Sequence, residues 1–244
     1  MSLYIGNKKV TPIKVSGGKE ELIPKEINSE GMYRIKGTIT EFKMPNTILD
    51  LGDNVLCGAF YGNYDLKVAD LSSLTKISGY NAMASTFKNC WNLTTVDLSN
   101  VTEIGMDSLT EAFESCSSLT SINFDKLTTA GRTSFYRTFS YCTNLQTIDF
   151  PSLTNLQDHK DGAFINSFEY TNLTDIYFRA LTSNSFNGSP EEFVYMLRNA
   201  TSTRTIKVHF PSNIENTIST LDGYPLFGGR SGKVELLFDL PATE

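Results

Sequence analysis

Histidine is scarce in this chain. Two are present among 244 residues, His159 and His209, and neither lies in a recognisable nucleophile motif. The glycine stretches at 16–18 and 228–230 lack the spaced glycines and following residues of a phosphate-binding loop. We therefore expect no catalytic residues, no bound cofactor and no enzyme activity.

Long apolar runs and an excess of basic charge are missing as well. The opening residues, MSLYIGNKKVTPIKV, contain no apolar run of signal-peptide length, and no stretch approaches the ~18 apolar residues of a membrane span. We expect synthesis in the cytoplasm without a recognisable signal peptide, and no membrane span. The 21 lysines and arginines stand against 27 aspartates and glutamates, and the net charge of -6 argues against a nucleic-acid partner.

Cysteine is also rare, and three of the four cysteines recur at a fixed spacing. They lie in three copies of one pattern, TFKNCWNLTTVDL, AFESCSSLTSINF and TFSYCTNLQTIDF. The phenylalanines of the three copies recur every 26 residues, at Phe87, Phe113 and Phe139. Self-similarity at such a period is the mark of a solenoid, in which each repeat is one supersecondary unit stacked on the next.

The cysteine column of Cys90, Cys116 and Cys142 has two interpretations. A thiolate metal site or a redox relay would need a C-x-x-C pair or a histidine at ligand spacing, and the sequence has neither. Small thiols stacked in a core need only burial, which is common for cysteine. We favour packing, and we expect free, buried thiols with no disulfide and no metal site.

The hydrophobic periodicity changes within each coil. Val96 and Leu98 alternate with polar residues, as in a strand with one buried face. Met106, Leu109 and Phe113 follow at helical spacing. Each coil is therefore predicted to contain a short strand, a turn and a short helix. Successive strands are then parallel neighbours joined by right-handed crossovers, which makes the predicted fold an α/β solenoid.

The repeat covers only part of the chain. About five coils are predicted over residues 46–185, beginning with a degenerate coil around Phe60 and ending with a lengthened one whose insertion at 158–161 should form a protruding loop. Residues 1–45 alternate like strands and are predicted to form a β-rich N-terminal leader or cap. Residues 186–244 should form a C-terminal cap of closing strands and a longer helix, with Ser189 as its N-cap and an apolar stripe over 193–197.

The repeated pattern resembles that of a known family. Ala112-Phe113, Cys116, Leu119, Ile122 and Phe124 resemble the BspA-like class of leucine-rich repeats. This resemblance implies a leucine-rich-repeat stack and a non-enzymatic recognition or adhesion module of bacteria, with relatives in phages. The opening LYIGNKKVTP also resembles the first residues of some phage and prophage virion proteins that carry such repeats.

Candidate site residues are those at which the copies differ. Asp70, Asp97 and Asp149 share one strand slot, with Asn123 between them, so their side chains should line one sheet face. Such carboxylates could hydrolyse a glycosidic bond or bind calcium, or they could form a solvated polar ladder, which we favour. Trp91 replaces small residues of the sister copies, and Tyr177 occupies the slot of Asp149. Both are candidate anchors for a protein or sugar, with packing against a neighbouring coil as the alternative.

Three functions follow from the sequence. The leading one is a non-enzymatic, protein- or glycan-binding or structural solenoid of a phage virion, in a fibre, tail or head decoration, used in host attachment or virion assembly. Its partners would be a protein or cell-surface glycan and, through residues 1–45, other virion subunits, and it could be an oligomer. The first alternative is an adhesin on the bacterial cell surface. The second is a glycan-active enzyme using the column of Asp70, Asp97 and Asp149.

Overall fold

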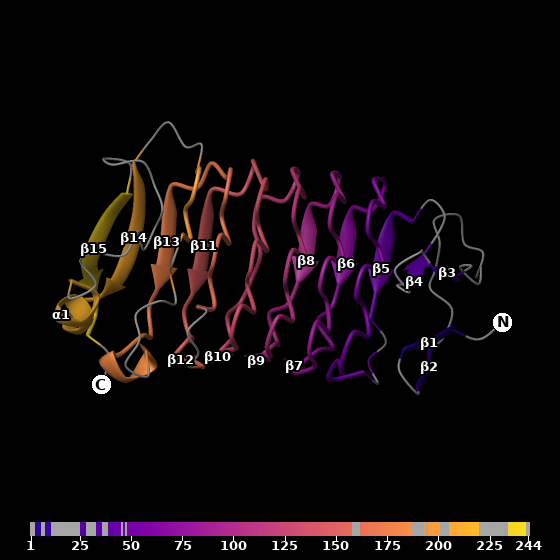
Figure 1. Ribbon diagram of the computed structural model, residues 1–244, viewed down its shortest axis with the longest axis horizontal. Coiled ribbons are helices and arrows are strands. Elements are labelled where there is room, and N and C mark those ends of the chain that lie inside the picture. The colour runs from indigo at the N-terminus through magenta and orange to yellow at the C-terminus, as the bar shows by residue number, and fades with distance from the viewer. Residues whose placement is uncertain are drawn as a thin grey trace.

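The protein is an elongated solenoid of about six coils stacked along its long axis (Figure 1). The computed structural model describes residues 3–5, 8–10, 25–27, 33–35, 39–44, 46, 48–157, 162–186, 193, 195–200, 205–219 and 234–242. The parallel solenoid predicted from the repeat is confirmed. The predicted loop at 158–161 and the predicted N-cap at Ser189 lie outside the described residues.

One side of the solenoid carries most of the strands, and we call it the front face. Its strands are all parallel, and the sequence alternation that predicted them places Val96, Ile122 and Ile148 in the core. A single bridge between Asp97 and Asn123 continues the ladder beyond the third strand. The strands of the front face are β5 (Glu41–Lys43), β6 (Val68–Asp70), β8 (Thr95–Asp97), β11 (Thr147–Phe150), β13 (Asp175–Phe178), β14 (Ile206–Pro211) and β15 (Val234–Leu240).

A second side carries four two-residue strands, which are also parallel and run in a row along the axis (Figure 1). They are β7 (Lys76–Ile77), β9 (Glu103–Ile104), β10 (Thr129–Ala130) and β12 (Asn155–Leu156). Before the first coil, the described residues form two pairs of antiparallel strands. The hairpin strands are β1 (Leu3–Ile5), β2 (Lys8–Val10), β3 (Lys25–Ile27) and β4 (Tyr33–Ile35).

The third side consists of consecutive turns. The prediction of a short helix in each coil is therefore wrong. Asp107, Glu111 and Ser115, each four residues apart, have left-handed backbones with φ of 55°, 55° and 63°. An α-helix would direct every N–H group to its own coil. Here the N–H of Leu109 donates to the carbonyl of Ser134 in the next coil at 3.0 Å. The N–H of Ala112 donates within its coil, to Leu109 at 2.9 Å.

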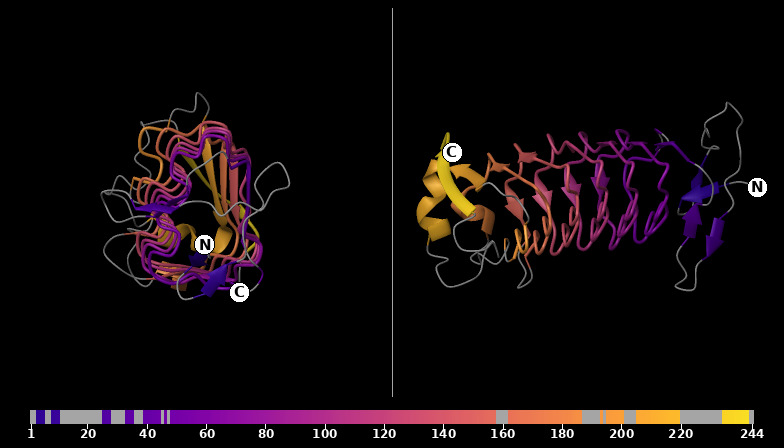
Figure 2. Two further views of the ribbon diagram at one scale, coloured as in Figure 1. Left: turned by 90° about the vertical axis from the view of Figure 1, so that its right-hand side faces the viewer. Right: turned by 90° about the horizontal axis from the view of Figure 1, so that it is seen from above.

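The turn side alternates bonds within a coil and bonds between coils along its whole length, and in the end-on view the three sides close around the core (Figure 2). One consequence is that Met106, predicted to face inward on a helix, is 39% exposed, whereas Leu109 and Phe113 are fully buried. In the described part of the longer helix expected near 189–200, residues 195–199 are turns, although Phe193, Met196 and Leu197 are buried as predicted.

The described helices are short and lie toward the C-terminal end of the chain. They are η1 (Ser183–Phe186), η3 (Ser212–Ile214) and α1 (Glu215–Ser219). α1 follows β14, and β14 pairs in parallel with both β13 and β15, so the C-terminal residues extend the front face.

The core is organised by columns of phenylalanine rings. Consecutive rings in one column of five are stacked with centroids 5.3 to 5.7 Å apart and planes within 14° of parallel. Offset stacking of this kind adds to the hydrophobic gain of burial. The repeat was recognised from the three middle rings of this column, which contains Phe60, Phe87, Phe113, Phe139 and Phe168.

Glycines that lie just after the short strands of the second side let neighbouring coils approach closely. A Cβ atom on Gly105 would lie 2.4 Å from the carbonyl oxygen of Ser78, and one on Gly79 would lie 2.1 Å from the carbonyl carbon of Gly52. Because these contacts are with backbone, no side-chain rotation can relieve them. Gly52 itself is different, since its Cβ would meet only the side chain of Val55, at 3.9 Å.

This contrast gives a paired prediction. Gly105→Ala should lower the free energy of unfolding by about 1–3 kcal/mol, because the coils must separate to admit the methyl group. Gly52→Ala is the matched control and should leave stability within roughly 0.5 kcal/mol. Urea denaturation followed by circular dichroism measures both. Equal loss of stability in the two variants would contradict the close approach at Gly105.

Candidate functional site

The candidate site lies on the front face, where one register position forms a polar column. Strand pairing aligns Asp70 with Asp97, Asp97 with Asn123, Asp149 with Tyr177, and Tyr177 with His209. The predicted column of aspartates with Asn123 between them is therefore present on one sheet face, and it continues to His209. The neighbouring residues Val96, Ile122 and Ile148 point into the core, so the column points outward.

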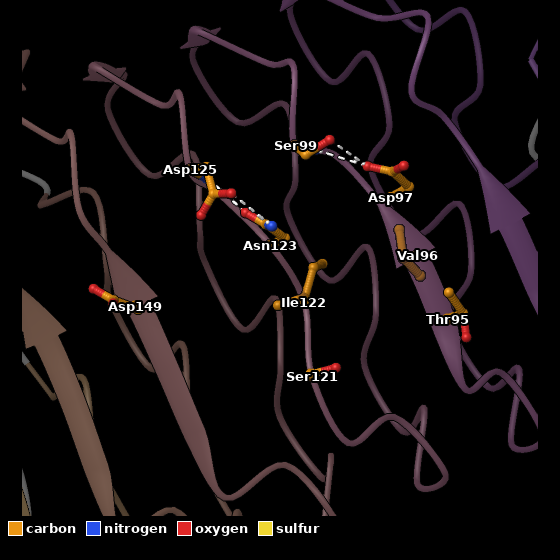
Figure 3. Close-up of a pocket in the computed structure, with 9 residues that line it drawn as sticks. All are labelled: Thr95, Val96, Asp97, Ser99, Ser121, Ile122, Asn123, Asp125 and Asp149. Atoms are coloured by element: carbon orange, nitrogen blue, oxygen red, sulfur yellow. Dashed lines mark hydrogen bonds between the residues drawn. The ribbon is translucent and has the colours of Figure 1, made fainter.

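An open pocket of about 500 Å³ lies in the middle of this column. The coil between strands β8 and β11 has no regular strand on this face and contributes only the bridge at Asn123, and the pocket lies there. Figure 3 shows Asp97, Asn123 and Asp149 projecting from three neighbouring coils around it. Its lining residues are Thr95, Val96, Asp97, Ser99, Ser121, Ile122, Asn123, Asp125 and Asp149.

The polar groups of the pocket are oriented by local hydrogen bonds. A carboxylate oxygen of Asp97 accepts from the backbone N–H of Ser99 at 3.0 Å and from its hydroxyl at 2.7 Å. Asn123 accepts from the backbone N–H of Asp125 at 2.7 Å and donates to its carboxylate at 2.9 Å (Figure 3). These bonds fix the side chains of Asp97, Asn123 and Asp125 where they line the pocket.

Asp149 is held by a cation from the next coil. The Nε of Arg179 donates to the two carboxylate oxygens of Asp149 at 3.0 and 2.8 Å. The same guanidinium lies 4.6 Å from the ring centroid of Tyr177, within the range of a cation–π contact. The preceding coils have Ser99, Asp125 and Pro151 at the position that corresponds to Arg179. A lone arginine at this repeat position could have been recognised from the sequence as a candidate partner of the aspartate column, and it was missed.

A second cluster forms around His209, at the C-terminal end of the column. Its ring stacks on Tyr177 with centroids 4.3 Å apart, and it is only 7% exposed. One ring nitrogen lies 3.1 Å from Asp175, and the other lies 3.0 Å from Asp239. Tyr177, predicted as an exposed anchor, is therefore half-buried between His209 and Arg179.

The carboxyl of Asp175 shows the electrostatic effect of this cluster. Burial alone would raise its pKa, but the hydrogen bond from His209, aided by Thr174 and Lys207, outweighs burial and lowers the pKa below its ordinary value. A carboxylate bonded to a buried imidazole thus joins β13 to β14, and Asp239 joins β14 to β15.

Trp91 lies apart from the pocket. Its side chain is 50% exposed and stacks on Tyr64 of the preceding coil, with ring centroids 4.4 Å apart and planes 28° apart. Tyr64 occupies the same slot four residues after its phenylalanine, as Trp91 does after Phe87. The structure therefore does not bring Trp91 together with Asp97, Asn123 and Asp149 in one pocket.

The cysteine column is structural in its geometry. Cys90, Cys116 and Cys142 are fully buried free thiols, as predicted. Each Sγ donates to a phenylalanine carbonyl of the preceding coil at 3.1 Å. Burial raises the pKa of the Cys90 thiol to about 12 and that of Cys116 well above 9.0. Over the part of the chain that the structure describes, no group of three or more His, Cys, Asp or Glu residues is arranged to hold a metal ion.

The stacked parallel coils and the polar front face define a leucine-rich-repeat solenoid. The family model described as BspA type leucine rich repeat region (6 copies) matches residues 25–159 and 85–219. The chain therefore belongs to the BspA-type leucine-rich repeat family. None of the described helices has the length and hydrophobicity of a membrane span.

Two solved structures are similar to the chain. A leucine-rich repeat protein of T. pallidum is 17% identical, with a TM-score of 0.38, over 91% of this chain and 97% of that chain. A leucine-rich repeat protein from Bacteroides ovatus is 18% identical, with a TM-score of 0.32, over 83% of this chain and 56% of that chain. Among curated proteins, none matches the chain.

The raised thiol pKa values predict low reactivity. In native protein at pH 8, iodoacetamide should leave Cys90, Cys116 and Cys142 unlabelled, because the thiolate is the nucleophile and burial disfavours it. After unfolding in guanidinium, all three should be labelled. Peptide mass spectrometry measures each site separately. Labelling of Cys116 in the native state at the rate seen after unfolding would contradict the buried column.

The lowered pKa of Asp175 predicts a stability change in acid. A folded pKa below the unfolded value stabilises the protein above the unfolded pKa, and this contribution is lost as the pH falls through the folded pKa. The native protein should therefore lose stability as the pH is lowered below about 4, and Asp175→Asn should lose less over the same interval. Thermal melts of both proteins between neutral and acidic pH measure the difference. Parallel curves would contradict this account of the Asp175–His209 contact.

Proposed function

We propose that this chain is a non-enzymatic binding solenoid whose front face contacts a protein or a cell-surface glycan. The single observation that carries the proposal is the pocket at Asn123, where the regular ladder of strands is interrupted. Leucine-rich-repeat proteins generally mediate protein interactions, which favours a binding or structural role over catalysis.

The chemistry of the pocket suits recognition. Hydroxyl, amide and carboxylate groups line it, whereas Val96 and Ile122 are nearly buried and contribute little apolar surface. A small number of precisely placed polar groups is what fixes the orientation of a ligand in a binding site. Because the polar groups are oriented by bonds to their own coil, they need little reordering when a partner arrives.

A glycan-active enzyme fits this geometry less well. Asp97 and Asp149 flank the pocket, but a glycosidase needs one carboxylic acid that donates a proton to the leaving group. Asp149 pairs with Arg179, and Asp97 accepts two hydrogen bonds from Ser99, so both carboxyl groups are already engaged as acceptors by neighbouring groups. Measurable glycan turnover that is lost in Asp97→Ala, with the fold intact, would favour the enzyme instead.

The biological setting belongs to the same proposal. We place the solenoid in a phage virion, in a fibre, tail or head decoration, with residues 1–45 contacting other virion subunits and the front face contacting the host. The resemblance of the opening residues to virion proteins supports this setting, and an adhesin on the bacterial cell surface is the alternative. Mass spectrometry of purified phage particles separates the two, since a surface adhesin would be absent from the particles.

The role of the front face predicts the effect of one substitution. Asn123→Arg should fill the pocket and weaken binding to the hits of an array of bacterial surface proteins and glycans by at least about tenfold. Asn155→Arg is the matched control, because Asn155 is an exposed asparagine on β12, on the second side. Surface plasmon resonance measures both variants. Equal affinity of Asn123→Arg and the unchanged protein would show that the pocket is not the contact.

A further inference from the structure

The exposed aromatic pair Tyr64–Trp91 is not needed by the fold. The corresponding slot of the next two coils holds Ser117 and Thr143, and the core of those coils is equally buried. Tyr64 and Trp91 are each 50% exposed, among the most exposed large hydrophobic side chains of the described residues. An aromatic ring that is half exposed to solvent and that packing does not require is a candidate for contact with a ligand.

The pair forms a stack with one open end. The two rings belong to consecutive coils and lie 4.4 Å apart, so each covers one face of the other. The other face of Trp91 is directed toward the following coil, which presents only Ser117 in that slot. The Ser117 hydroxyl lies 3.4 Å from the Trp91 carbonyl oxygen, and its side chain is too small to cover the indole ring.

The surface beyond Trp91 is polar and neutral. We call it the shelf and define it as Ser117, Ser118, Thr143 and Asn144, to which Asn92 of the Trp91 coil is adjacent. These side chains are half-buried or exposed, and they offer hydroxyl and amide groups without charge. A hot spot for a protein partner is instead surrounded by further contacts that exclude water. An aromatic face beside neutral hydrogen-bonding groups matches a sugar ring, whose C–H groups pack on the aromatic face while its hydroxyls bond to the polar groups.

We propose that Trp91, supported from behind by Tyr64, stacks on a pyranose ring of a neutral glycan whose hydroxyls bond to the shelf. The inference deepens the proposed binding function and rests on it. The shelf is also close to the front-face pocket in sequence, because Trp91 and Ser117 precede the pocket residues Thr95 and Ser121 by four positions each. Successive coils lie about 4.8 Å apart, so an oligosaccharide along the axis would meet one shelf position per coil.

Trp91 is the only tryptophan of the chain, so its fluorescence reports directly on this face. The probes are four neutral oligosaccharides: maltotetraose, cellotetraose, tetra-N-acetylchitotetraose and mannotetraose. At least one should change the emission saturably at low millimolar concentration. Calorimetry with that sugar should show binding at least about tenfold weaker in Trp91→Ala. Tyr80→Ala is the control, because Tyr80 is a 45% exposed aromatic outside the stack, and it should bind as the unchanged protein does.

A second variant tests the open face itself. Ser117→Trp should extend the stack over Trp91 and block the sugar while leaving the fold, checked by circular dichroism, unchanged. The proposal is overturned if none of the four sugars changes the emission, or if Trp91→Ala or Ser117→Trp binds the sugar as tightly as the unchanged protein. A response to N-acetyltyrosinamide without a response to any sugar overturns it in favour of a protein partner.

The two substitutions Asn123→Arg and Trp91→Ala distinguish failure of the glycan inference from failure of the front-face proposal. If array binding is lost in Asn123→Arg but retained in Trp91→Ala, the shelf inference fails and the front-face function stands. If both variants retain full array binding, both proposals fail.

Discussion

The close stacking of one coil on the next is the constraint on which the rest of this structure depends. Ordering the 26 residues of a coil costs roughly 1–2 kcal/mol per residue in backbone entropy, more than its few core side chains return. Bonds between coils must supply the difference, and they run along all three sides. On the turn side every second N–H donates to the next coil, which requires the left-handed residues at every fourth position.

This constraint also explains the polar residues inside the core. Thr86, Cys90 and Ser167 are fully buried, and each side chain donates to a carbonyl of the preceding coil, at 2.8, 3.1 and 2.6 Å. Each of these carbonyls also accepts a backbone N–H bond from its own coil, so the side chain adds a second bond, and the buried hydroxyl or thiol is itself satisfied. The cysteine column and the Thr and Ser residues thus join neighbouring coils through side chains, in addition to the bonds between their backbones.

The sequence was a good guide to the solenoid and to its polar column, because both follow from a fixed period and from strand alternation. It misled on the turn side, since Leu109 and Phe113 are buried equally well by a helix or by turns, and spacing alone cannot separate the two. It could not show the pocket, which depends on the loss of regular pairing at Asn123 rather than on any residue type. The contact of His209 with Asp239 lies where the register between β14 and β15 shifts, and the sequence pattern did not predict this shift.

The arrangement of the coils has a mechanical consequence. β1 and β15 lie at opposite ends of the long axis (Figure 1), and the hydrogen bonds between coils run along that axis. Tension applied through the two ends therefore pulls the coils apart one layer at a time, rather than shearing many strands together. Each released coil of 26 residues lengthens the chain by up to roughly 85 Å. A solenoid built in this way yields to tension in small steps, and the coils that remain stacked keep their structure.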